Sequence, residues 1–365
     1  MPRPHAANST ARTPRILLVS AMFPLPASKH SAEDYAFWLE KFLGHIETDV
    51  YFFAPPTFAP TVRSSRPTSL LITIDTTYPT PFDVPPLNGL ETQYEAMHSK
   101  DREAFRHNPS LYAVWNAKPW LLNQAVEKMR ERGEVYDYAF WSDAGSFRGE
   151  HAYRAWPDPA RVHEVMDAGD AKDDRIFIPL TGVHPRTTRF WVEQQGPIDA
   201  EVSEGSFFGG APAAISWYMQ TFYAYHNYYL SLGLFVGKDQ TLINALLLLF
   251  PDHFSTVYYR DALAPAHTRW PVLLPYFDAG FLGACGSEWY YYHFFLANEE
   301  EREHMRDMWI RDEANRRAWA AKWAGWIWWT ERQRCRVTRS RNFEDILRDT
   351  FGNDWRPPQK LIEIS

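Results

Sequence analysis

The sequence predicts an α/β fold in which a sheet of buried strands is flanked by helices. Two observations support this fold class. Short, continuous apolar runs end in proline or turn residues, and segments whose apolar residues recur at helical spacing lie between them. Alternation of these two patterns is typical of βα units. We expect the fold to begin at residue 15, after a polar, Pro-containing tail over residues 1–14 that is predicted to be disordered.

The first strands and the first helix are predicted at the start of this region. RILLVSAMF (15–23) is a continuous apolar run of the kind that a buried strand shows, and two prolines follow it. SAEDYAFWLEKFLG (31–44) has apolar residues at helical spacing and ends at a glycine. TDVYFFAPP (48–56) and SLLITID (69–75) are predicted to be two further buried strands, joined by a Pro-rich loop.

A second helix is predicted after a polar, Pro-containing stretch with some helical character. In WNAKPWLLNQAVEKMRERG (115–133), Pro119 suits the first turn and Gly133 the C-terminal stop. One face of this helix is apolar and is formed by Leu121, Ala125 and Met129.

The strand that follows, VYDYAFW (135–141), leads to an acid, Asp143. Ligands of open α/β sheets bind just outside the carboxyl ends of the strands, so we expect Asp143 to lie where chemistry occurs. A single carboxylate can hold Mg²⁺ or Mn²⁺ together with ligand phosphate oxygens. Gly145 permits close backbone approach, and Arg148 could face a phosphate, a carboxylate or Asp143 itself. The alternative is a turn-capping Asp beside a surface Arg.

Two helix starts further along the chain are candidate binding positions. Gly209 and Gly210 precede a helix predicted to begin near Pro212, whose free N–H groups favour an anionic or hydroxyl-rich ligand. A tight strand-to-helix turn is the alternative. Asp239 opens the apolar helix TLINALLLLF, where capping and the helix dipole favour an acid in any case. GLFVGKD (233–239) lacks the spacing of a phosphate loop and is predicted to be a turn between helices.

The last part of the chain, residues 298–365, is predicted to be a helical extension packed on the preceding domain. Trp319, Trp323 and Trp326 recur at i, i+4 and i+7 and form an aromatic stripe. Docking of the extension is the expected use of this stripe, and a sugar-binding or partner-binding face is the alternative.

Composition excludes some classes of function. The formal net charge of -7 argues against a nucleic-acid partner held by phosphate contacts, which needs a basic face. The most apolar run, Ala245–Phe250, is far shorter than the roughly 20 residues of a membrane span, so none is expected. Aromatic residues make up 16% of the chain, more than a core of this size needs. They indicate either a stacking groove for rings or aromatic packing between helices.

The two cysteines and the N-terminus suggest a location. Cys285 and Cys335 are expected to form no disulfide framework and have no metal-ligand spacing, so they fit either a reducing compartment or indifference to redox. Both are expected to be buried or inert. The first residues contain no signal peptide or anchor pattern. A cytoplasmic location is therefore expected, with the Golgi or secretory pathway as the alternative if an anchor is missing.

Four features in order resemble a known family. They are the helix with WNAKPWLL, the strand with YDYAFWSDAGSFR, the Phe-Gly-Gly before a helix, and the Asp-Gln before an apolar helix. Over roughly residues 15–275 the chain resembles the bacterial HtrL/YibB-like family, which is related to glycosyltransferases of the GT-A fold. The resemblance implies a GT-A-like (Rossmann-like) mixed sheet flanked by helices, with residues 15–297 as the catalytic domain.

The resemblance also implies a substrate and a cofactor. The expected donor is a nucleoside diphosphate sugar, with a UDP-sugar favoured, and the acceptor is a glycan or another hydroxyl compound. In GT-A enzymes an Asp-x-Asp motif at a strand end binds a divalent cation, Mn²⁺ or Mg²⁺, that bridges the donor diphosphate. The matching tripeptide here is Asp143-Ala144-Gly145, which lacks the second acid. Either Asp143 holds the metal with help from elsewhere, or metal binding is weak or absent. Lys118 matches a basic residue that approaches the donor phosphates, with a solvated lysine as its alternative.

Further site residues are implied in the same way. Asp239 and Gln240 are expected to contact the transferred sugar or the acceptor hydroxyl, and Lys118, Arg148 and a metal are expected to share the charge of the leaving diphosphate. A late histidine often completes the metal site, and His267 and His293 are the candidates, each with packing as its alternative.

Three hypotheses for function follow. The favoured one is a metal-assisted glycosyltransferase. The second is a non-catalytic carbohydrate- or nucleotide-binding protein with a degenerate transferase fold, which the missing second acid would suit. The third is an unrelated α/β hydrolase that uses the abundant carboxylates.

Overall fold

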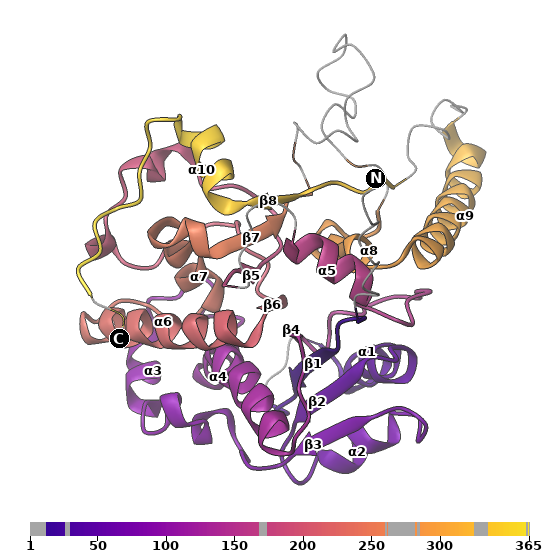
Figure 1. The fold of residues 1–365 in the computed structure, drawn as a ribbon, viewed down its shortest axis with the longest axis horizontal. Helices are drawn as coiled ribbons and strands as arrows, with labels where there is room; N and C mark the ends of the chain where they lie inside the picture. The colour runs from indigo at the N-terminus through magenta and orange to yellow at the C-terminus, as the bar shows by residue number, and fades with distance from the viewer. Residues whose placement is uncertain are drawn as a thin grey trace, which may run out of the picture.

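The computed structural model describes residues 12–25, 30–167, 174–259, 261, 282, 285–324, 335–362 and 364. Within these residues the fold is α/β, as expected, with a mixed sheet of eight strands and helices on both of its faces (Figure 1). The strands are β1 Ile16–Ala21, β2 Asp49–Phe53, β3 Ile72–Asp75, β4 Tyr138–Ser142, β5 Ile176–Phe177, β6 Phe207–Gly210, β7 Phe254–Val257 and β8 Ser340–Asn342. The helices are α1 Ala32–His45, α2 Ala59–Ser64, α3 Glu91–His98, α4 Pro109–Glu131, α5 Pro159–Asp167, α6 Pro212–Ser231, α7 Asp239–Leu249, α8 Tyr291–Phe295, α9 Glu299–Ala324 and α10 Phe343–Phe351.

The strands lie in the order β3-β2-β1-β4-β6-β5-β7-β8. The first four are parallel to one another, and β6 runs antiparallel to both of its neighbours, β4 and β5. β7 is parallel to β5 and antiparallel to β8. Strand order reverses between β1 and β4, because the chain leaves β1 for β2 on one side and returns from β3 to β4 on the other. Such a switch point opens a crevice at the carboxyl ends of the two strands.

The strands from β2 to β7 in the sheet contribute to two cores, because successive side chains point to opposite faces of the sheet. In β1, Leu17 and Val19 pack on one face against α4, α6 and α7, whereas Leu18 packs on the other against α1, α5 and α8. These are the two helical layers on either side of the sheet in Figure 1. Burial on both faces explains why the strands are continuous apolar runs in the sequence.

Most predicted elements are confirmed, with one correction to a helix start. Helix α4 begins at Pro109, with the side chain of Asn108 accepting the N–H of Leu111, so Pro119 lies inside the helix and not in its first turn. Proline removes one intrahelical hydrogen bond there, but the buried face of the helix packs along its whole length. Lys118 is therefore a mid-helix residue.

The prediction of a helical extension over residues 298–365 is only partly right, because this segment also contains a strand. α9 and α10 are helices, but β8 pairs with β7 and becomes the edge strand of the same sheet. The predicted boundary after residue 297 therefore does not divide the fold. The tryptophan stripe lies outside the described residues, since neither the side chains of Trp319 and Trp323 nor any part of Trp326 is described. Residues 1–11 of the predicted tail are also outside them, and Arg12 forms an ion pair with Asp137.

The prediction of unpaired cysteines is wrong. Cys285 and Cys335 form a disulfide across a sequence separation of 50 residues. Both are buried, as expected. The spacing of two cysteines so far apart does not predict a disulfide. The pair becomes evident only in the structure, where the segment before α8 approaches the segment before β8.

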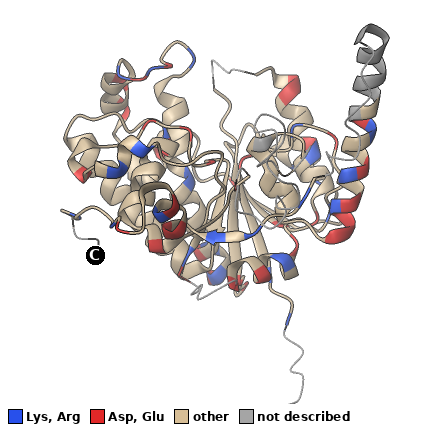
Figure 2. Ribbon diagram, turned by 90° about the horizontal axis from the view of Figure 1, so that it is seen from above, with Lys and Arg blue, Asp and Glu red and all other residues tan. Residues whose placement is uncertain are grey.

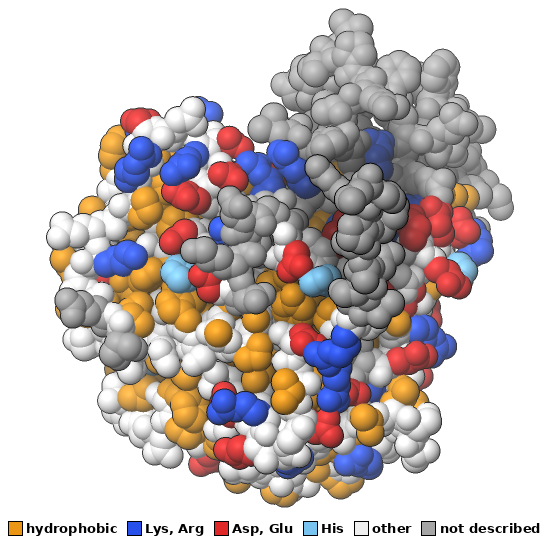
Figure 3. Space-filling model, viewed as in Figure 1, with side chains coloured by type: hydrophobic (Ala, Val, Ile, Leu, Met, Phe, Trp, Pro, Cys, Tyr) orange, Lys and Arg blue, Asp and Glu red, His pale blue; other side chains and the backbone are white. Residues whose placement is uncertain are grey.

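The surface carries charges of both signs. Figure 2 shows Lys and Arg intermixed with Asp and Glu along the helices, and Figure 3 shows the same mixture on one face of the molecule. Within the described residues, no helix combines the length and the apolar character that a bilayer crossing requires.

Candidate functional site

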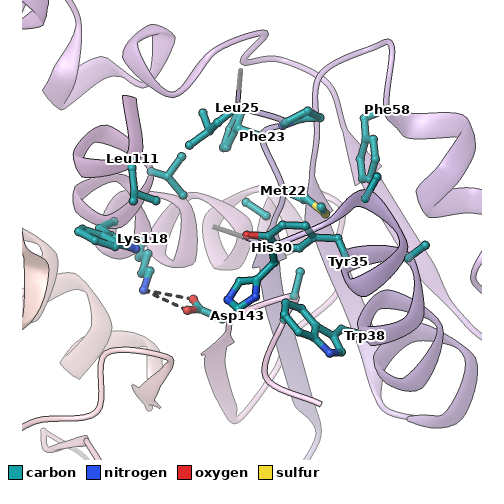
Figure 4. Close-up of a pocket in the computed structure, with 18 of the residues that line it drawn as sticks. Met22, Phe23, Leu25, His30, Tyr35, Trp38, Phe58, Leu111, Lys118 and Asp143 are labelled. Carbon is teal, nitrogen blue, oxygen red and sulfur yellow. Dashed lines mark hydrogen bonds and ion pairs between the residues drawn. The ribbon is translucent and has the colours of Figure 1, made fainter. Parts of the chain in front are cut away.

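A cavity of about 640 Å³ opens at the switch point of the sheet. Met22 and Phe23, which follow β1, and Asp143 and Arg148, which follow β4, line it together (Figure 4). The cavity is therefore in the position where ligands bind to open α/β sheets. It also has the size of a small-molecule site.

The position of Asp143 at the tip of β4 is confirmed. Its backbone N–H donates to the carbonyl of Ser206 at 2.9 Å, which continues the pairing of β4 with the β6 side of the sheet by one residue. Its carboxylate accepts a hydrogen bond of 2.6 Å from Nε1 of Trp141, and its side chain is about one third exposed at 34%. Gly145 follows in the turn. A side chain at this position would be crowded, since a Cβ would lie 3.1 Å from the ring of Trp38. The turn therefore presents the acid to the cavity and packs closely beneath an aromatic wall.

Lys118 connects Asp143 to a second predicted residue. Its ammonium lies 3.2 Å from Oδ1 of Asp143 and 3.1 Å from Oδ2 of Asp239, and it donates to the carbonyl of Gly205 at 2.9 Å. Its side chain is only 4% exposed, so it is not the solvated lysine of the alternative reading. Figure 4 shows Lys118 and Asp143 pointing toward one another.

This arrangement places two carboxylates around one buried cation. Burial lowers the pKa of Lys118, but the charges of Asp143 and Asp239 outweigh it and raise the pKa above its ordinary value. Burial raises the pKa of Asp239, with Lys118 acting in the opposite direction. Lys118 is therefore the positive centre of the site.

Asp239 and Gln240 lie where α7 begins, and the structure brings them to this centre. Oδ1 of Asp239 accepts the N–H of Gln240 at 2.9 Å, so the acid also serves the helix start. The amide of Gln240 donates to the carbonyl of Ser203 at 2.7 Å and holds the loop before β6. Both readings of Asp239, as a site acid and as a helix-start acid, are compatible with these contacts.

Arg148 lies between two aromatic rings. Its guanidinium is 4.7 Å from the ring centre of Trp38 and 5.4 Å from that of Tyr290, and its Nε donates to the carbonyl of Gly145 at 3.0 Å. These contacts hold an exposed cation over the cavity by cation–π attraction. Ala144 is buried in the core beside the turn and presents no polar side chain.

A second cavity, of about 910 Å³, adjoins the first. Asp143, Arg148 and Tyr290 line both cavities. The two cavities differ in their other walls. Aromatic rings line both cavities, but the first has Arg106 and Lys118 as further cations, whereas the second includes the polar side chains of Glu204, Ser206, Gln240 and Ser287.

Gly209 and Gly210 do not belong to this site. Because β6 is antiparallel to β4, they pair with Phe140 and Ala139, toward the opposite end of β4 from Asp143. A Cβ on Gly209 would lie 2.1 Å from the carbonyl oxygen of Ala139. The glycines are therefore explained by close packing of two strands. The helix start at Pro212 is confirmed, but it is at the end of β6 remote from the cavities.

The histidine candidates do not extend the site. His267 lies outside the described residues. His293 is buried and stacks on Phe147 with ring centres 4.2 Å apart, and burial lowers its pKa well below its ordinary value. The packing alternative therefore describes His293, although it borders the second cavity.

The described residues do not fit a resident divalent ion at Asp143. The ammonium of Lys118 already neutralises this carboxylate, and Ala144 supplies no ligand oxygen. Among the described residues, no group of three or more His, Cys, Asp or Glu side chains is arranged to hold a metal. The expected Mn²⁺ or Mg²⁺ therefore remains a prediction for experiment.

Sequence reasoning missed Glu204, which lines the second cavity. An acid flanked by Ser203 and Gly205 before a short strand gives little signal of its own. No family model matches the chain, and no curated protein has a significantly similar sequence.

Proposed function

We propose that the protein is a glycosyltransferase that passes a sugar from a nucleoside diphosphate sugar to an acceptor hydroxyl. The observation that carries the proposal is the meeting of two unlike cavities at Asp143, Arg148 and Tyr290. A transfer between two substrates needs two adjoining binding spaces with the reacting atoms at their junction. The α/β fold and the acid at the tip of β4 agree with a GT-A-like catalytic domain.

The first cavity suits the nucleotide. Tyr35, Trp38, Phe58 and Trp115 line it and offer ring faces and edges for a base. Arg106 and Arg148 supply positive charge for a diphosphate. Cleavage of a sugar–phosphate bond builds negative charge on the leaving diphosphate, and cations fixed in advance stabilise that charge. Lys118 and Arg148 are proposed to stabilise the negative charge of the leaving diphosphate.

The experiment is a transfer assay on the full chain with a panel of UDP-, GDP- and other nucleotide sugars. Thermal-shift screening first selects the donor, since a ligand that binds only the folded state raises the apparent stability. Asp143→Asn is expected to lower turnover by about 10²-fold or more, because it changes the charge balance at the junction. Asp137→Asn, just before the other end of β4 and paired with Arg12, is the matched control and should keep full activity.

The same assay tests the expected metal. Turnover in EDTA within about twofold of that in Mn²⁺ would agree with Lys118 as the cation of the site. A strict requirement for Mn²⁺ would show that the ion pair opens when a metal and a donor bind. Equal turnover of Asp143→Asn and the unmodified chain would contradict the proposed role of Asp143.

One observation favours the non-catalytic alternative. Lys118 engages both Asp143 and Asp239, which leaves these acids committed to an internal ion pair. A carbohydrate- or nucleotide-binding protein would show calorimetric binding of a donor with no transfer to any acceptor and no hydrolysis.

The disulfide bears on location. Structural disulfides persist in oxidising compartments and are rare in the cytosol. The pair of Cys285 and Cys335 thus supports the secretory alternative over the cytoplasmic expectation. Fractionation of the source cells, with the redox state of the two cysteines measured in each fraction, tests this assignment.

A further inference from the structure

Glu204 is a buried acid on the wall of the second cavity. It is 6% exposed, and its Oε1 accepts the backbone N–H of Ser206 at 3.0 Å. Its Oε2 has no hydrogen-bond partner in the part of the chain that the structure describes. A buried carboxylate oxygen without a partner costs free energy, so its retention here calls for an explanation.

The backbone around Glu204 is held firmly on both sides. The carbonyl of Ser203 accepts the amide of Gln240, and the carbonyl of Gly205 accepts the ammonium of Lys118. The N–H of Glu204 itself donates to the carbonyl of Pro179 at 2.9 Å. The carboxyl group is therefore fixed relative to Lys118 and to the junction of the two cavities.

Asp143 and Asp239 differ from Glu204 in this respect. Both are paired with the ammonium of Lys118, whereas no ion pair involves Glu204 within the described residues. Of the three acids, Glu204 is thus the one whose carboxylate is not already paired with the ammonium of Lys118. It lines the second cavity and not the first.

We infer that Glu204 is the proton acceptor for the acceptor hydroxyl, which binds in the second cavity and supplies the missing partner of Oε2. This inference rests on the proposed transferase function. The hydroxyl oxygen forms a bond to the anomeric carbon, and its proton passes to Glu204. The bond between the anomeric carbon and the phosphate oxygen breaks, and its electron pair leaves with the nucleoside diphosphate.

The surroundings of Glu204 suit this role. Burial raises its pKa to about 7 against the opposing hydrogen bonds from Ser206, and the charge of Asp143 adds to the rise while that of Lys118 opposes it. A base with a pKa near the working pH is the most effective in proton transfer. The groups that interact with its carboxylate are Ser206, Asp143, Lys118, Tyr290 and Tyr292, and Arg148 lines the same cavity.

The proposed role of Glu204 predicts the stereochemical outcome. A hydroxyl that Glu204 deprotonates attacks the anomeric carbon directly, from the side opposite the leaving diphosphate. Transfer in a single displacement inverts the configuration at that carbon. A double displacement would require a carboxylate nucleophile instead.

Glu204→Gln tests the inference, because the amide keeps the acceptor oxygen for Ser206 but cannot take a proton. We expect kcat to fall by about 10²- to 10⁴-fold while donor affinity, measured by calorimetry, stays within about twofold. The acid limb of the kcat/KM profile, with its midpoint near pH 7 in the unmodified chain, should disappear. Glu301→Gln is the matched control and should keep its rate. Glu301 is likewise buried, accepts backbone N–H groups and has an Oε2 without a hydrogen-bond partner among the described residues, but it lines neither of the two cavities.

The outcomes separate the inference from the proposed function. If Glu204→Gln retains both its rate and its acid limb, or if the product keeps the donor configuration, the assignment of Glu204 is overturned and the transferase proposal stands. If the unmodified chain transfers no sugar from any donor, both fail together. Glu204→Asp distinguishes a folding defect, because it retains the charge and should recover part of the activity if the variant is folded.

Discussion

At the scale of the residue, the site is organised by Lys118. A lysine that is almost fully buried needs compensating charge, and two carboxylates from β4 and α7 provide it. The cation in turn keeps Asp143 and Asp239 close together at the edge of a cavity. One side chain thereby fixes the relative positions of three segments that are far apart in the sequence.

Lys118→Met is expected to lower the free energy of unfolding by about 3 to 5 kcal/mol, because it leaves two buried or half-buried carboxylates without their cation. Urea unfolding measured near neutral pH checks this value. Arg130→Met, on the same helix and in an exposed pair with Glu127, is the control and should cost less than about 1 kcal/mol. A loss for Lys118→Met as small as that of the control would contradict the role given to Lys118.

Arg148 illustrates a different use of charge at the same scale. It is exposed, yet two rings and a backbone carbonyl hold it at the junction of the cavities. An exposed arginine held in this way keeps most of its charge available to a ligand. The turn Asp143-Ala144-Gly145 and the arginine that follows it, Arg148, therefore form one structural unit.

At the scale of the element, the approach of β4 and β6 decides where the loop before β6 lies. Gly209 allows β4 and β6 to pack closely, because a Cβ at this position would clash with the carbonyl oxygen of Ala139. This close pairing carries the loop of Glu204 to the carboxyl end of β4, since the strands are antiparallel. The glycine pair contributes to the site only indirectly.

Gly209→Ala is expected to destabilise the protein by about 2 kcal/mol or more, because its Cβ would meet backbone atoms that cannot move cheaply. Gly149→Ala is the matched control, since nothing lies within 4 Å of a Cβ at that position. The change in melting temperature of the two variants, compared side by side, is the measurement. A stable Gly209→Ala protein would mean that the strands are further apart than the structure shows.

At the scale of the whole molecule, the disulfide ties the wall of the second cavity to the edge strand of the sheet. Cys285 lines that cavity, and Cys335 lies five residues before β8 in the chain. The last part of the chain is thus a component of the fold and not an appendage.

Replacement of both cysteines by serine is expected to lower the free energy of unfolding by about 2 to 4 kcal/mol, chiefly because the unfolded chain gains freedom over the 50-residue loop. Thermal unfolding with and without reductant gives the same comparison without mutation. The serine variant itself is the control for the reductant and should not respond to it. Equal stability of the oxidised and reduced chains would contradict a structural role for the bond.

The sequence by itself determined the α/β class, most of the strands and helices, and the placement of Asp143 at a strand tip. These features depend on local periodicity and on the residues that end each element, which are short-range properties of the chain. The placement of Asp239 in the first turn of α7 is of the same kind. The start of α4 was misplaced because Pro119 is tolerated within a helix that is packed along its length.

Only the tertiary structure decided which of these residues meet. The pairing of Lys118 with two acids, the exclusion of Gly209 and Gly210, the disulfide and the position of Glu204 all depend on strand order and direction. Local patterns do not encode these, because contacts between distant segments are chosen by the burial of whole faces of the sheet and by the pairing of buried polar groups. The arrangement of the candidate site at the carboxyl ends of β1 and β4 is therefore a property of the assembled sheet and its helices.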